Sequence, residues 1–402
     1  MVIGQFSPIT GGAERQCLTL CRALHRRGHE VRVLTVWQSR DWPRREEIEG
    51  VTVERVWYPQ LRLFAFKIVG FGFLAWLTFT CKVLKTIRGF DIVHVHQGLW
   101  PAFSATLAAT LAGKPILCKI GNSGARFDLR VLWRNHLYGP VAVQLMKRKV
   151  ERFVSTSTAV GRDLQSWGIP SQKLAHIPNG VELREEVKGL LSHPGRKRTD
   201  DQVRFLFVGS LTAKKNTLLF PEALKRLPSD YRNRIRLTVL GDGPQRSTLA
   251  DRLQADGLTR SVQLAGFVGQ PDEHFLNSEV FVLPSLTEGL SNAALEAMSW
   301  GLPLILSFAG GNTDLVERRE NPGEVDINRR HFVEGCNGLL VDPGRAESLA
   351  EAFKFMIDYP EKRLSMGRRS YEIVAARYSM DRVVGQYEAL YDQCRFPGGQ
   401  NR

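Results

Sequence analysis

Apolar and polar positions follow a repeating order of strand, loop and helix through much of the chain. The clearest example begins with an apolar strand at Val280–Leu283 and passes through a loop containing Pro284, Ser285 and Thr287. Good helix formers follow from Asn292 to Trp300, and Gly301 ends that helix before a second apolar strand. Such repeats are typical of an α/β protein with doubly wound parallel sheets.

The same order of elements recurs before and after this stretch. We expect Val51–Val56 to be an edge element of the first sheet. The other predicted strands lie at 2–6, 30–36, 91–96, 114–119, 153–156, 203–208, 235–240, 261–267 and 338–341, and amphipathic helices are predicted at 345–358, 361–377 and 379–395.

The length of the chain predicts two domains, because 402 residues exceed the usual size of one hydrophobic core. A polar, charged stretch near residue 190 reads as a linker. We expect an N-terminal Rossmann-like domain at 1–185, a linker at 186–202 and a C-terminal Rossmann-like domain at 203–378. The last segment, 379–402, is a helix that could cross back to the N-terminal domain.

Charge and cysteine content narrow the class of protein. The 55 Lys and Arg residues against 41 Asp and Glu give a net charge of +14, which favours a nucleotide diphosphate, an acidic membrane or nucleic acid as partner. The six cysteines show no C-x-x-C spacing, so neither a zinc site nor a disulfide framework is indicated. The start of the chain reads as a strand rather than a signal peptide, so we expect a cytoplasmic protein.

A long apolar run at 61–87 raises the question of membrane contact. The fourteen uncharged residues between Lys67 and Lys82 would rise only ~21 Å as a helix, short of the ~30 Å hydrocarbon core. The run therefore predicts either a buried crossover helix or a helix in the membrane interface, with contact near Phe64, Phe66 and Phe71.

A second stretch, 126–152, interleaves basic residues with Phe, Leu, Trp and Tyr. Interleaving of this kind can bind nucleic acid, but no RNA- or DNA-binding motif accompanies it. A basic surface near anionic lipid or a lipid-linked acceptor explains the composition equally well, and so does a solvated helix face.

Candidate binding chemistry follows the strands. Glu288 and Glu296 are eight residues apart, which on a helix would place them near one face, with Gly289 allowing close approach of an anion between them. Lys214 and Lys215 follow the strand 203–208, where lysine can neutralise phosphate.

The N-terminal half has similar loops. Gly11 and Gly12 lie between a strand and a helix that carries Glu14. His94 and His96 lie on one face of a strand, without a third metal ligand nearby, and Lys119 and Asn122 flank a glycine-rich loop.

These motifs, in this order, resemble the retaining glycosyltransferases of family 4, which have the GT-B fold of two facing Rossmann-like domains around an interdomain cleft. The matching segments are Gly11-Gly12-Ala-Glu, Asp91-Ile-Val-His-Val-His, Ile177-Pro-Asn-Gly-Val, Phe207-Val-Gly-Ser-Leu, Leu240-Gly-Asp-Gly-Pro, the E-x7-E signature from Glu288 to Glu296, and Gly338-Leu-Leu-Val-Asp-Pro.

The resemblance implies a role for each matching residue. Glu288, Lys215 and Lys214 would act at the reacting centre, with Glu288 on the donor sugar and the lysines on the diphosphate. Donor binding would also involve Glu296 on the ribose, and Gly289, Leu290, Ser291, Asn292, Gly209, Ser210 and Gly241. The acceptor or phosphate loop would comprise Gly11, Gly12, Glu14, His96, Lys119 and Asn122.

Two positions depart from the family pattern. Ser210 stands where relatives carry an arginine, so Lys214 would supply the second positive charge. The loop at Gly121 lacks a histidine that assists the donor sugar in many relatives, and Lys119 or Asn122 would substitute.

The implied activity is transfer of a sugar from a nucleotide diphosphate, with retention of anomeric configuration, without metal or cofactor. The expected acceptor is a lipid-linked or polysaccharide-precursor molecule at the cytoplasmic face of the membrane. A soluble acceptor, a nucleotide-sugar epimerase, an inactive sugar-nucleotide-binding module and a nucleic-acid protein are the alternatives.

Overall fold

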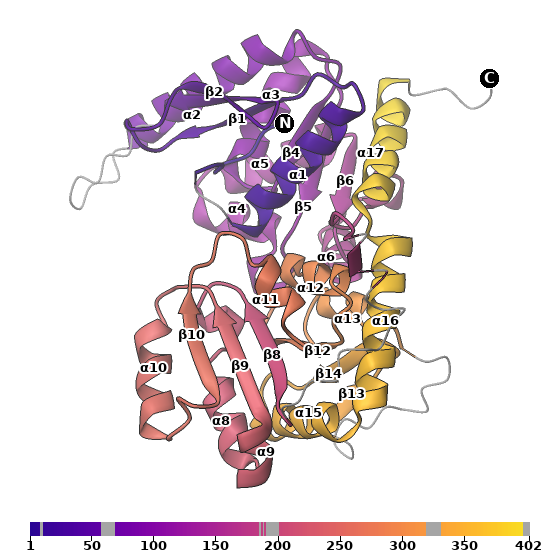
Figure 1. Cartoon of the computed structure of the whole chain (residues 1–402). Helices are drawn as coiled ribbons and strands as arrows, with labels where there is room; N and C mark the ends of the chain where they lie inside the picture. The colour runs from indigo at the N-terminus through magenta and orange to yellow at the C-terminus, as the bar shows by residue number, and fades with distance from the viewer. Residues whose placement is uncertain are drawn as a thin grey trace. The chain divides into compact units, whose positions relative to one another are not determined.

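The computed structural model describes residues 1–8, 11–57, 69–184, 186–187, 189, 201–318 and 331–396, with the backbone alone for 69–75. The chain divides into two compact units. The first unit combines Met1–Gly180 with Met380–Arg402, and the second comprises Val181–Ser379. Figure 1 shows the elements of both units in chain order.

The first unit is built on a central sheet. Strand β1 (Arg32–Trp37) pairs in parallel with β3 (Val51–Trp57), and β3 pairs with β2 (Arg45–Ile48) in the antiparallel direction. The parallel strands on the other side are β4 (Val93–His96), β5 (Ile116–Ile120), β6 (Arg152–Ser155) and β7 (Leu174–His176). Val2 bridges Leu34 of β1 and Val95 of β4, so the first segment of the chain lies between those two strands.

Two predictions about this sheet need correction. Val51–Val56 is not at the edge, because β2 lies outside it. The expected strand at 2–6 is reduced to the bridges at Val2.

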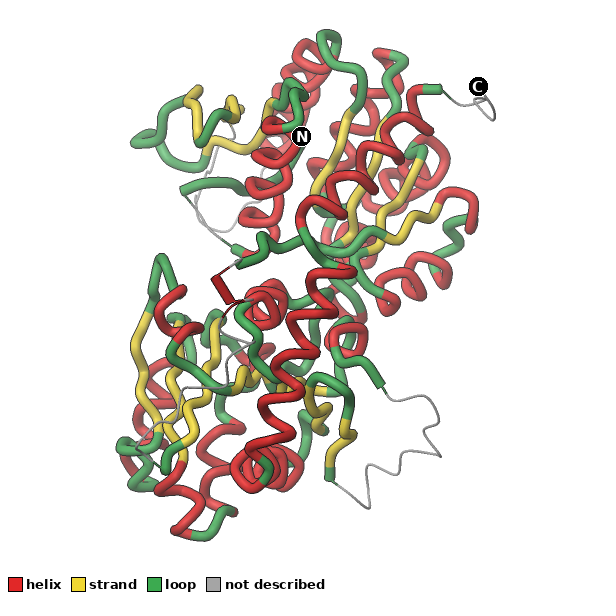
Figure 2. Tube along the Cα trace, turned by 45° about the vertical axis from the view of Figure 1, so that its right-hand side comes forward, coloured by secondary structure: helices red, strands yellow, loops and turns green. Residues whose placement is uncertain are grey.

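Helices cover both faces of this sheet. On one face α1 (Gly12–Arg26) packs against α17 (Met380–Arg395), with Leu20, Leu24 and Tyr387 in a shared hydrophobic cluster. On the other face lie α2 (Val69–Ile87), α3 (Trp100–Ala112) and α5 (Gly139–Lys149), and α4 (Asp128–Asn135) packs on α5. Figure 2 shows these helices around the strands. Helix α6 (Thr158–Ser166) follows β6.

The second unit has a seven-stranded sheet in the order β10-β9-β8-β11-β12-β14-β13. Its strands are β8 (Val203–Val208), β9 (Ile235–Leu240), β10 (Val262–Gly266), β11 (Val280–Leu283), β12 (Leu304–Ser307), β13 (Phe332–Glu334) and β14 (Gly338–Val341). All neighbours pair in parallel except β13 with β14. The predicted doubly wound α/β fold is therefore confirmed.

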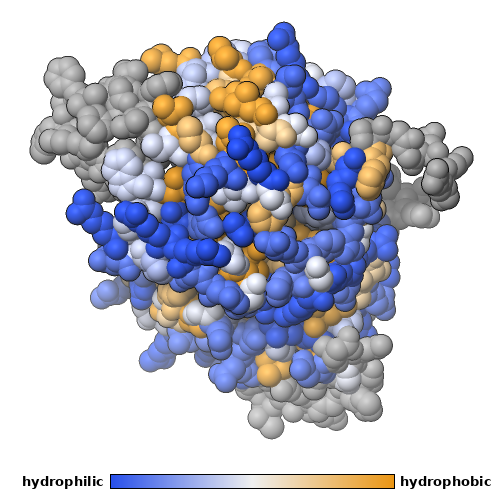
Figure 3. Space-filling model, turned by 90° about the horizontal axis from the view of Figure 1, so that it is seen from above, coloured by the Kyte–Doolittle hydropathy of each residue, from blue (hydrophilic) through white to orange (hydrophobic). Residues whose placement is uncertain are grey.

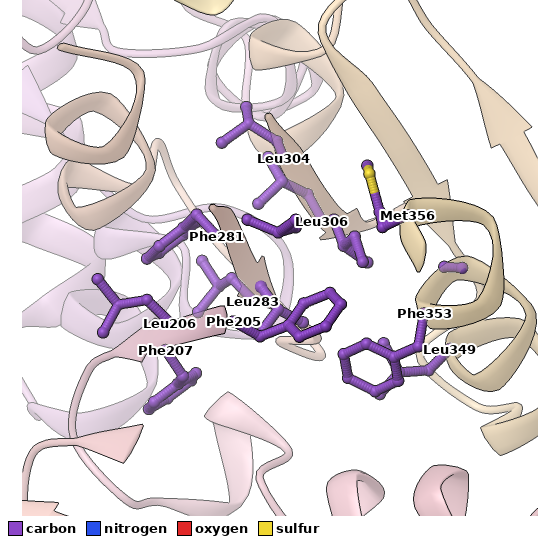
Figure 4. Close-up of a cluster of buried hydrophobic side chains, with 14 of the residues drawn as sticks. Phe205, Leu206, Phe207, Phe281, Leu283, Leu304, Leu306, Leu349, Phe353 and Met356 are labelled. Atoms are coloured by element: carbon purple, nitrogen blue, oxygen red, sulfur yellow. The ribbon is translucent and has the colours of Figure 1, made fainter. Parts of the chain in front are cut away.

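The helices of this unit and its aromatic core complete the fold. Phe205 of β8 meets Phe353 of α15 edge to face, with ring centroids 4.8 Å apart, and Figure 4 shows this core. The helices are α8 (Leu219–Arg226), α9 (Ser229–Arg234), α10 (Arg246–Ala255), α11 (Asp272–Leu276), α12 (Asn292–Ser299), α13 (Asn312–Leu315), α15 (Ala346–Asp358) and α16 (Pro360–Arg377).

Some predictions fall on parts of the chain that are not described. Phe64 and Phe66, the side chain of Phe71, and most of the linker at 186–202 lie outside the described residues. Within the described part, no helix is both long enough and apolar enough to cross a bilayer.

Candidate active site

The two central strands of the second unit carry the candidate donor site. β8 is the first strand of this sheet, and β11 lies next to it on the side opposite β9. The chain therefore extends the sheet from β8 through β9 and β10 on one side, and from β11 through β12 and β14 on the other, so the direction reverses between β8 and β11. Ligands of open α/β sheets bind at the carboxyl ends of the strands at such a reversal point. The loop after β8 carries Lys214 and Lys215, and the loop after β11 carries Glu288.

Lys215 and Glu288 form an ion pair across these two loops. Lys215 Nζ lies 2.6 Å from Glu288 Oε1, and only 13% and 7% of the two side chains are exposed. Burial alone would raise the pKa of Glu288, but the positive charges of Lys215 and Lys214, together with hydrogen bonds from Lys215 and Ser285, outweigh that effect and lower the pKa. Glu288 is therefore held as a carboxylate.

Asn216 holds the loop that carries the lysines. Its backbone is in the left-handed region, with a φ of 56°. Its side-chain Nδ2 donates hydrogen bonds to Pro284 O at 3.2 Å and to Pro343 O at 2.8 Å. One amide thus ties together the loops after β8, β11 and β14.

Glycines allow further loops to approach this pair. Gly310 has a φ of +54°, and a Cβ added there would lie 2.0 Å from Glu288 O. The N–H of Gly311 donates to Glu288 O at 3.1 Å. Similarly, a Cβ at Gly241 would lie 2.0 Å from Gly209 O. Both contacts require a residue without a side chain.

Helix α12 begins directly after the Glu288 loop. Ser291 caps it, because its hydroxyl accepts a hydrogen bond from Ala294 N at 3.3 Å. Glu296 lies half-buried within the helix, whereas Glu288 precedes its first residue by four positions. The predicted helical relationship between the two glutamates is therefore wrong, because the intervening loop breaks the helical phase.

The other predicted donor residues lie along these same loops. Gly289 and Leu290 are buried, Asn292 is half-buried and opens α12, and Ser210 is exposed beyond Gly209. The second unit thus collects every predicted donor-side residue from helix α12 and the loops after β8, β9 and β11.

The first unit contains a buried carboxylate that sequence reasoning missed. Asp128 accepts hydrogen bonds from Gly98 N at 3.0 Å, from Asn122 Nδ2 at 2.8 Å and from Gly121 N at 3.4 Å. It therefore joins the loops after β4 and β5. Burial raises its pKa, although these hydrogen bonds act in the opposite direction. No motif marks this aspartate in the sequence.

The two histidines of β4 lie in the core of the first unit, beneath α17. Their rings stack with centroids 4.5 Å apart, and His94 Nδ1 is 2.8 Å from Tyr391 Oη. Burial lowers the pKa of both, so they are neutral. Burial also lowers the pKa of Lys119 to about 8, and its ammonium lies 5.8 Å from the ring centre of Tyr387. Among the described residues, no group of His, Cys, Asp and Glu side chains could hold a metal ion.

Glu14 and His96 come together at a pocket of about 350 Å³ at the carboxyl edge of the first sheet. Gly11, Gly12, Lys119 and Asn122 do not line this pocket. Of the six residues predicted for the acceptor loop, two therefore share a cavity.

Two family models match the chain, one in each half. "Glycosyltransferase Family 4" matches residues 10–185, and "Glycosyl transferases group 1" matches residues 192–373. Together they cover most of the sequence.

Individual relatives agree with these matches. The Escherichia coli UDP-Gal:alpha-D-GlcNAc-diphosphoundecaprenol alpha-1,3-galactosyltransferase is 31% identical over 61% of this chain and 65% of its own length. The 2-deoxystreptamine glucosyltransferase of Streptomyces kanamyceticus is 25% identical over 94% of this chain and 98% of its own. The crystal structure of HepE from Anabaena with UDP superposes with a TM-score of 0.74 at 18% identity, covering 98% of this chain and 99% of that one. This structural likeness confirms the GT-B type of fold.

Proposed function

The chain belongs to the family 4 glycosyltransferases and is a hexosyltransferase-type enzyme that uses a nucleotide sugar, and we propose that it serves a lipid-linked acceptor at the cytoplasmic face of a membrane. We further propose that the reaction retains the anomeric configuration and takes place at the Lys215–Glu288 pair.

The observation that carries the donor assignment is this buried ion pair at the reversal point of the second sheet. A diphosphate beside Lys215 would be stabilised by the positive charge of that lysine and by the positive end of the α12 dipole. Negative charge develops on the leaving diphosphate during transfer. Lys215 and the start of α12 would therefore stabilise the transition state more than the ground state. Lys214 lies one residue away and adds to the positive field.

The carboxylates would orient the two sugars of the donor. Glu288 stays ionised beside Lys215 and accepts hydrogen bonds from hydroxyls of the transferred sugar. Glu296, in the second turn of α12, would accept those of the ribose. The bond from the anomeric carbon to the diphosphate oxygen breaks while the acceptor hydroxyl attacks the same face, and the leaving phosphate takes its proton.

A donor screen tests this assignment. Thermal shift and hydrolysis are measured with UDP-, GDP- and ADP-sugars, without added metal, on the wild type, on Glu296→Ala and on the control Glu273→Ala, which alters an exposed glutamate of α11. We expect one donor to stabilise the wild type and the control, and Glu296→Ala to lose about 1–3 kcal/mol of binding free energy. If no nucleotide sugar shifts the wild type, the donor site is wrongly placed.

The acceptor proposal rests on the surface of α4, α5 and their connecting turn. Trp133, Leu137 and Val141 are 37%, 94% and 67% exposed there. Arg130 and Arg134 accompany them, and the only acidic residue in the sequence from 126 to 150 is the buried Asp128. Apolar side chains bordered by cations match the interface of an anionic bilayer. Figure 3 shows one face of the molecule, on which hydrophobic side chains lie among hydrophilic ones.

Vesicle binding tests the membrane contact. The wild type should sediment with phosphatidylglycerol vesicles and much less with phosphatidylcholine, and added salt should weaken the binding. Replacing Leu137 and Val141 by Ser should weaken it about tenfold. Leu364→Ser, at a 48% exposed position of α16, is the control and should bind like the wild type. A protein that ignored anionic vesicles and glycosylated a soluble acceptor at full rate would overturn the proposal.

A further inference from the structure

Two hydrogen bonds tie the loop after β8 to the loop after β11, one on each side of Lys215. The backbone N–H of Leu286 donates to Lys214 O at 2.8 Å. The side-chain Nδ2 of Asn216 donates to Pro284 O at 3.2 Å. The residue before Lys215 and the residue after it are therefore both attached to the segment that leaves β11.

The amide of Asn216 also reaches a third loop. Its Nδ2 donates a second hydrogen bond, to Pro343 O, at 2.8 Å. An amide nitrogen carries two hydrogens, so this side chain can make both bonds at once. Pro343 follows β14, which pairs with β12, and β12 pairs with β11. The turn that carries Lys215 is thus attached to backbone on the far side of β11 as well as to the loop after β11.

The turn itself gives Lys215 little support. It is a short 3-10 helix, η3 (Ala213–Lys215), and such segments have poor hydrogen-bond geometry. Asn216 ends it in the left-handed conformation, with a φ of 56° and a ψ of 35°. Glycine adopts this conformation more easily than any residue with a side chain. The backbone would therefore favour glycine at this position, and the two hydrogen bonds are what the asparagine side chain adds.

The place of the Lys215 ammonium depends on where this turn lies. Lys215 Nζ is 2.6 Å from Glu288 Oε1, on the loop to which the turn is tied. Fixed charges stabilise a transition state best when they need no rearrangement during the reaction, and a displacement of ~1 Å can slow a reaction about 100-fold. A turn that shifted against the loop after β11 would disturb both the ion pair and the contact of the lysine with a leaving diphosphate.

We propose that Asn216 is a positioning residue of the donor site, whose amide holds the turn so that Lys215 meets Glu288 and the diphosphate in the geometry that transfer requires. In this role Asn216 acts through Lys215. The inference rests on the proposed transferase function and makes it more specific.

A double-mutant cycle tests the positioning without any substrate. Unfolding in urea is measured for the wild type, Asn216→Gly, Glu288→Gln and the double variant. Glycine keeps the left-handed backbone, and its greater freedom in the unfolded chain cancels in the cycle. The factor by which Glu288→Gln raises the unfolding equilibrium constant should be about tenfold smaller in the Asn216→Gly protein, because the ion pair is already weakened there. Additive effects of the two changes would overturn the proposal.

Kinetics separate positioning from stability. Hydrolysis of the nucleotide sugar found in the donor screen is measured well below the unfolding midpoint of each variant. Asn216→Gly should lower kcat about tenfold or more, and by a larger factor than it raises the KM for the donor, because a displaced lysine affects the leaving diphosphate more than the bound donor. Asn216→Asp keeps the size of the side chain but loses the N–H donors, so it should be at least as slow. A wild-type kcat in either variant would contradict the proposal.

The control is Glu49→Gly, which also removes a side chain from a left-handed residue. Glu49 has a φ of 52° and lies in the turn between β2 and β3 of the first unit. This change should leave kcat unaltered, and its effect on unfolding should add to that of Glu288→Gln. If the wild type hydrolyses no nucleotide sugar, the transferase assignment fails, while the cycle still decides whether Asn216 positions the ion pair.

Discussion

Lys215 and Glu288 depend on each other before any substrate arrives. Their side chains are largely buried, and a buried charge without a partner costs several kcal/mol. The two residues are 73 positions apart in the chain, so the fold alone brings them together. A bound diphosphate would be a second anionic partner for Lys215. Glu288 would stay shielded from water.

Replacing Glu288 tests this dependence through pH. Glu288→Gln should destabilise the protein by about 3 kcal/mol at pH 7 and lower transfer about 10²–10³-fold. Because the folded pKa of Glu288 is lowered, its contribution to stability is present above the unfolded pKa of ~4.3 and is lost as the pH falls through the folded pKa. The difference in free energy of unfolding between wild type and variant should therefore shrink in acid, as measured by urea denaturation.

The control is Glu222→Gln, which alters an exposed partner of Arg252. It should change stability by less than about 1 kcal/mol at any of these pH values. A difference between wild type and Glu288→Gln that stayed constant from pH 7 to pH 3 would contradict the assigned role of the ion pair.

Individual residues were predictable where a motif marks them and not elsewhere. Lys215, Glu288 and Glu296 stand out through their spacing within family motifs, and their functional roles stay predictions. Asp128 and Asn216 do not stand out, because their side chains act by hydrogen bonding to backbone groups of distant loops. The hydrogen-bond partner of His94 is Tyr391, 297 positions away, and no local sequence pattern predicts this contact.

Among the elements, the turn between β12 and α13 supports the loop after β11 through Gly310. Gly310→Ala should strain a left-handed backbone and push against Glu288 O. We therefore expect the variant to be less stable and to hydrolyse the donor at least about tenfold more slowly. Gly257→Ala is the matched control, because Gly257 has a φ of +66° but open space around it.

The comparison of these two variants separates backbone strain from displacement of Glu288. Both should lose about 1–2 kcal/mol from the left-handed conformation, measured by thermal unfolding. Only Gly310→Ala should also lose donor hydrolysis. Equal hydrolysis by both would show that this turn does not position Glu288.

Element prediction succeeded where periodicity was strong. The expected helices at 345–358, 361–377 and 379–395 agree closely with α15, α16 and α17. The short edge strands β2 and β13 escaped prediction, because β2 reads Arg-Glu-Glu-Ile without a clear apolar alternation and is fixed by pairing with β3. The phase between Glu288 and Glu296 was wrong because a helical period was carried into a loop.

For the whole molecule, the first unit draws on both ends of the sequence. Residues 181–379 form a continuous second unit, whereas α17 completes the first. A chain of residues 181–379 expressed alone should therefore unfold cooperatively in urea. Residues 1–180 alone would expose the surface that packs on the fully buried Tyr387, and they should aggregate.

A direct fusion provides the control. A Cβ at Gly180 would lie 3.2 Å from Met380 Cα, so a short Gly-Ser linker can join residues 1–180 to 380–402. This fusion should be monomeric and cooperative where residues 1–180 are not, as judged by size exclusion and urea denaturation. A well-folded 1–180 fragment would contradict the structural role of α17.

The position of α17 also sets an order of events during synthesis. The second unit is complete in the nascent chain once residue 379 has left the ribosome, whereas the first must wait for α17. At ~5–20 residues per second, the first 180 residues spend roughly 10–40 s without their closing helix while the second unit is made. The portion translated first is therefore finished last, and it is the portion that would need a chaperone.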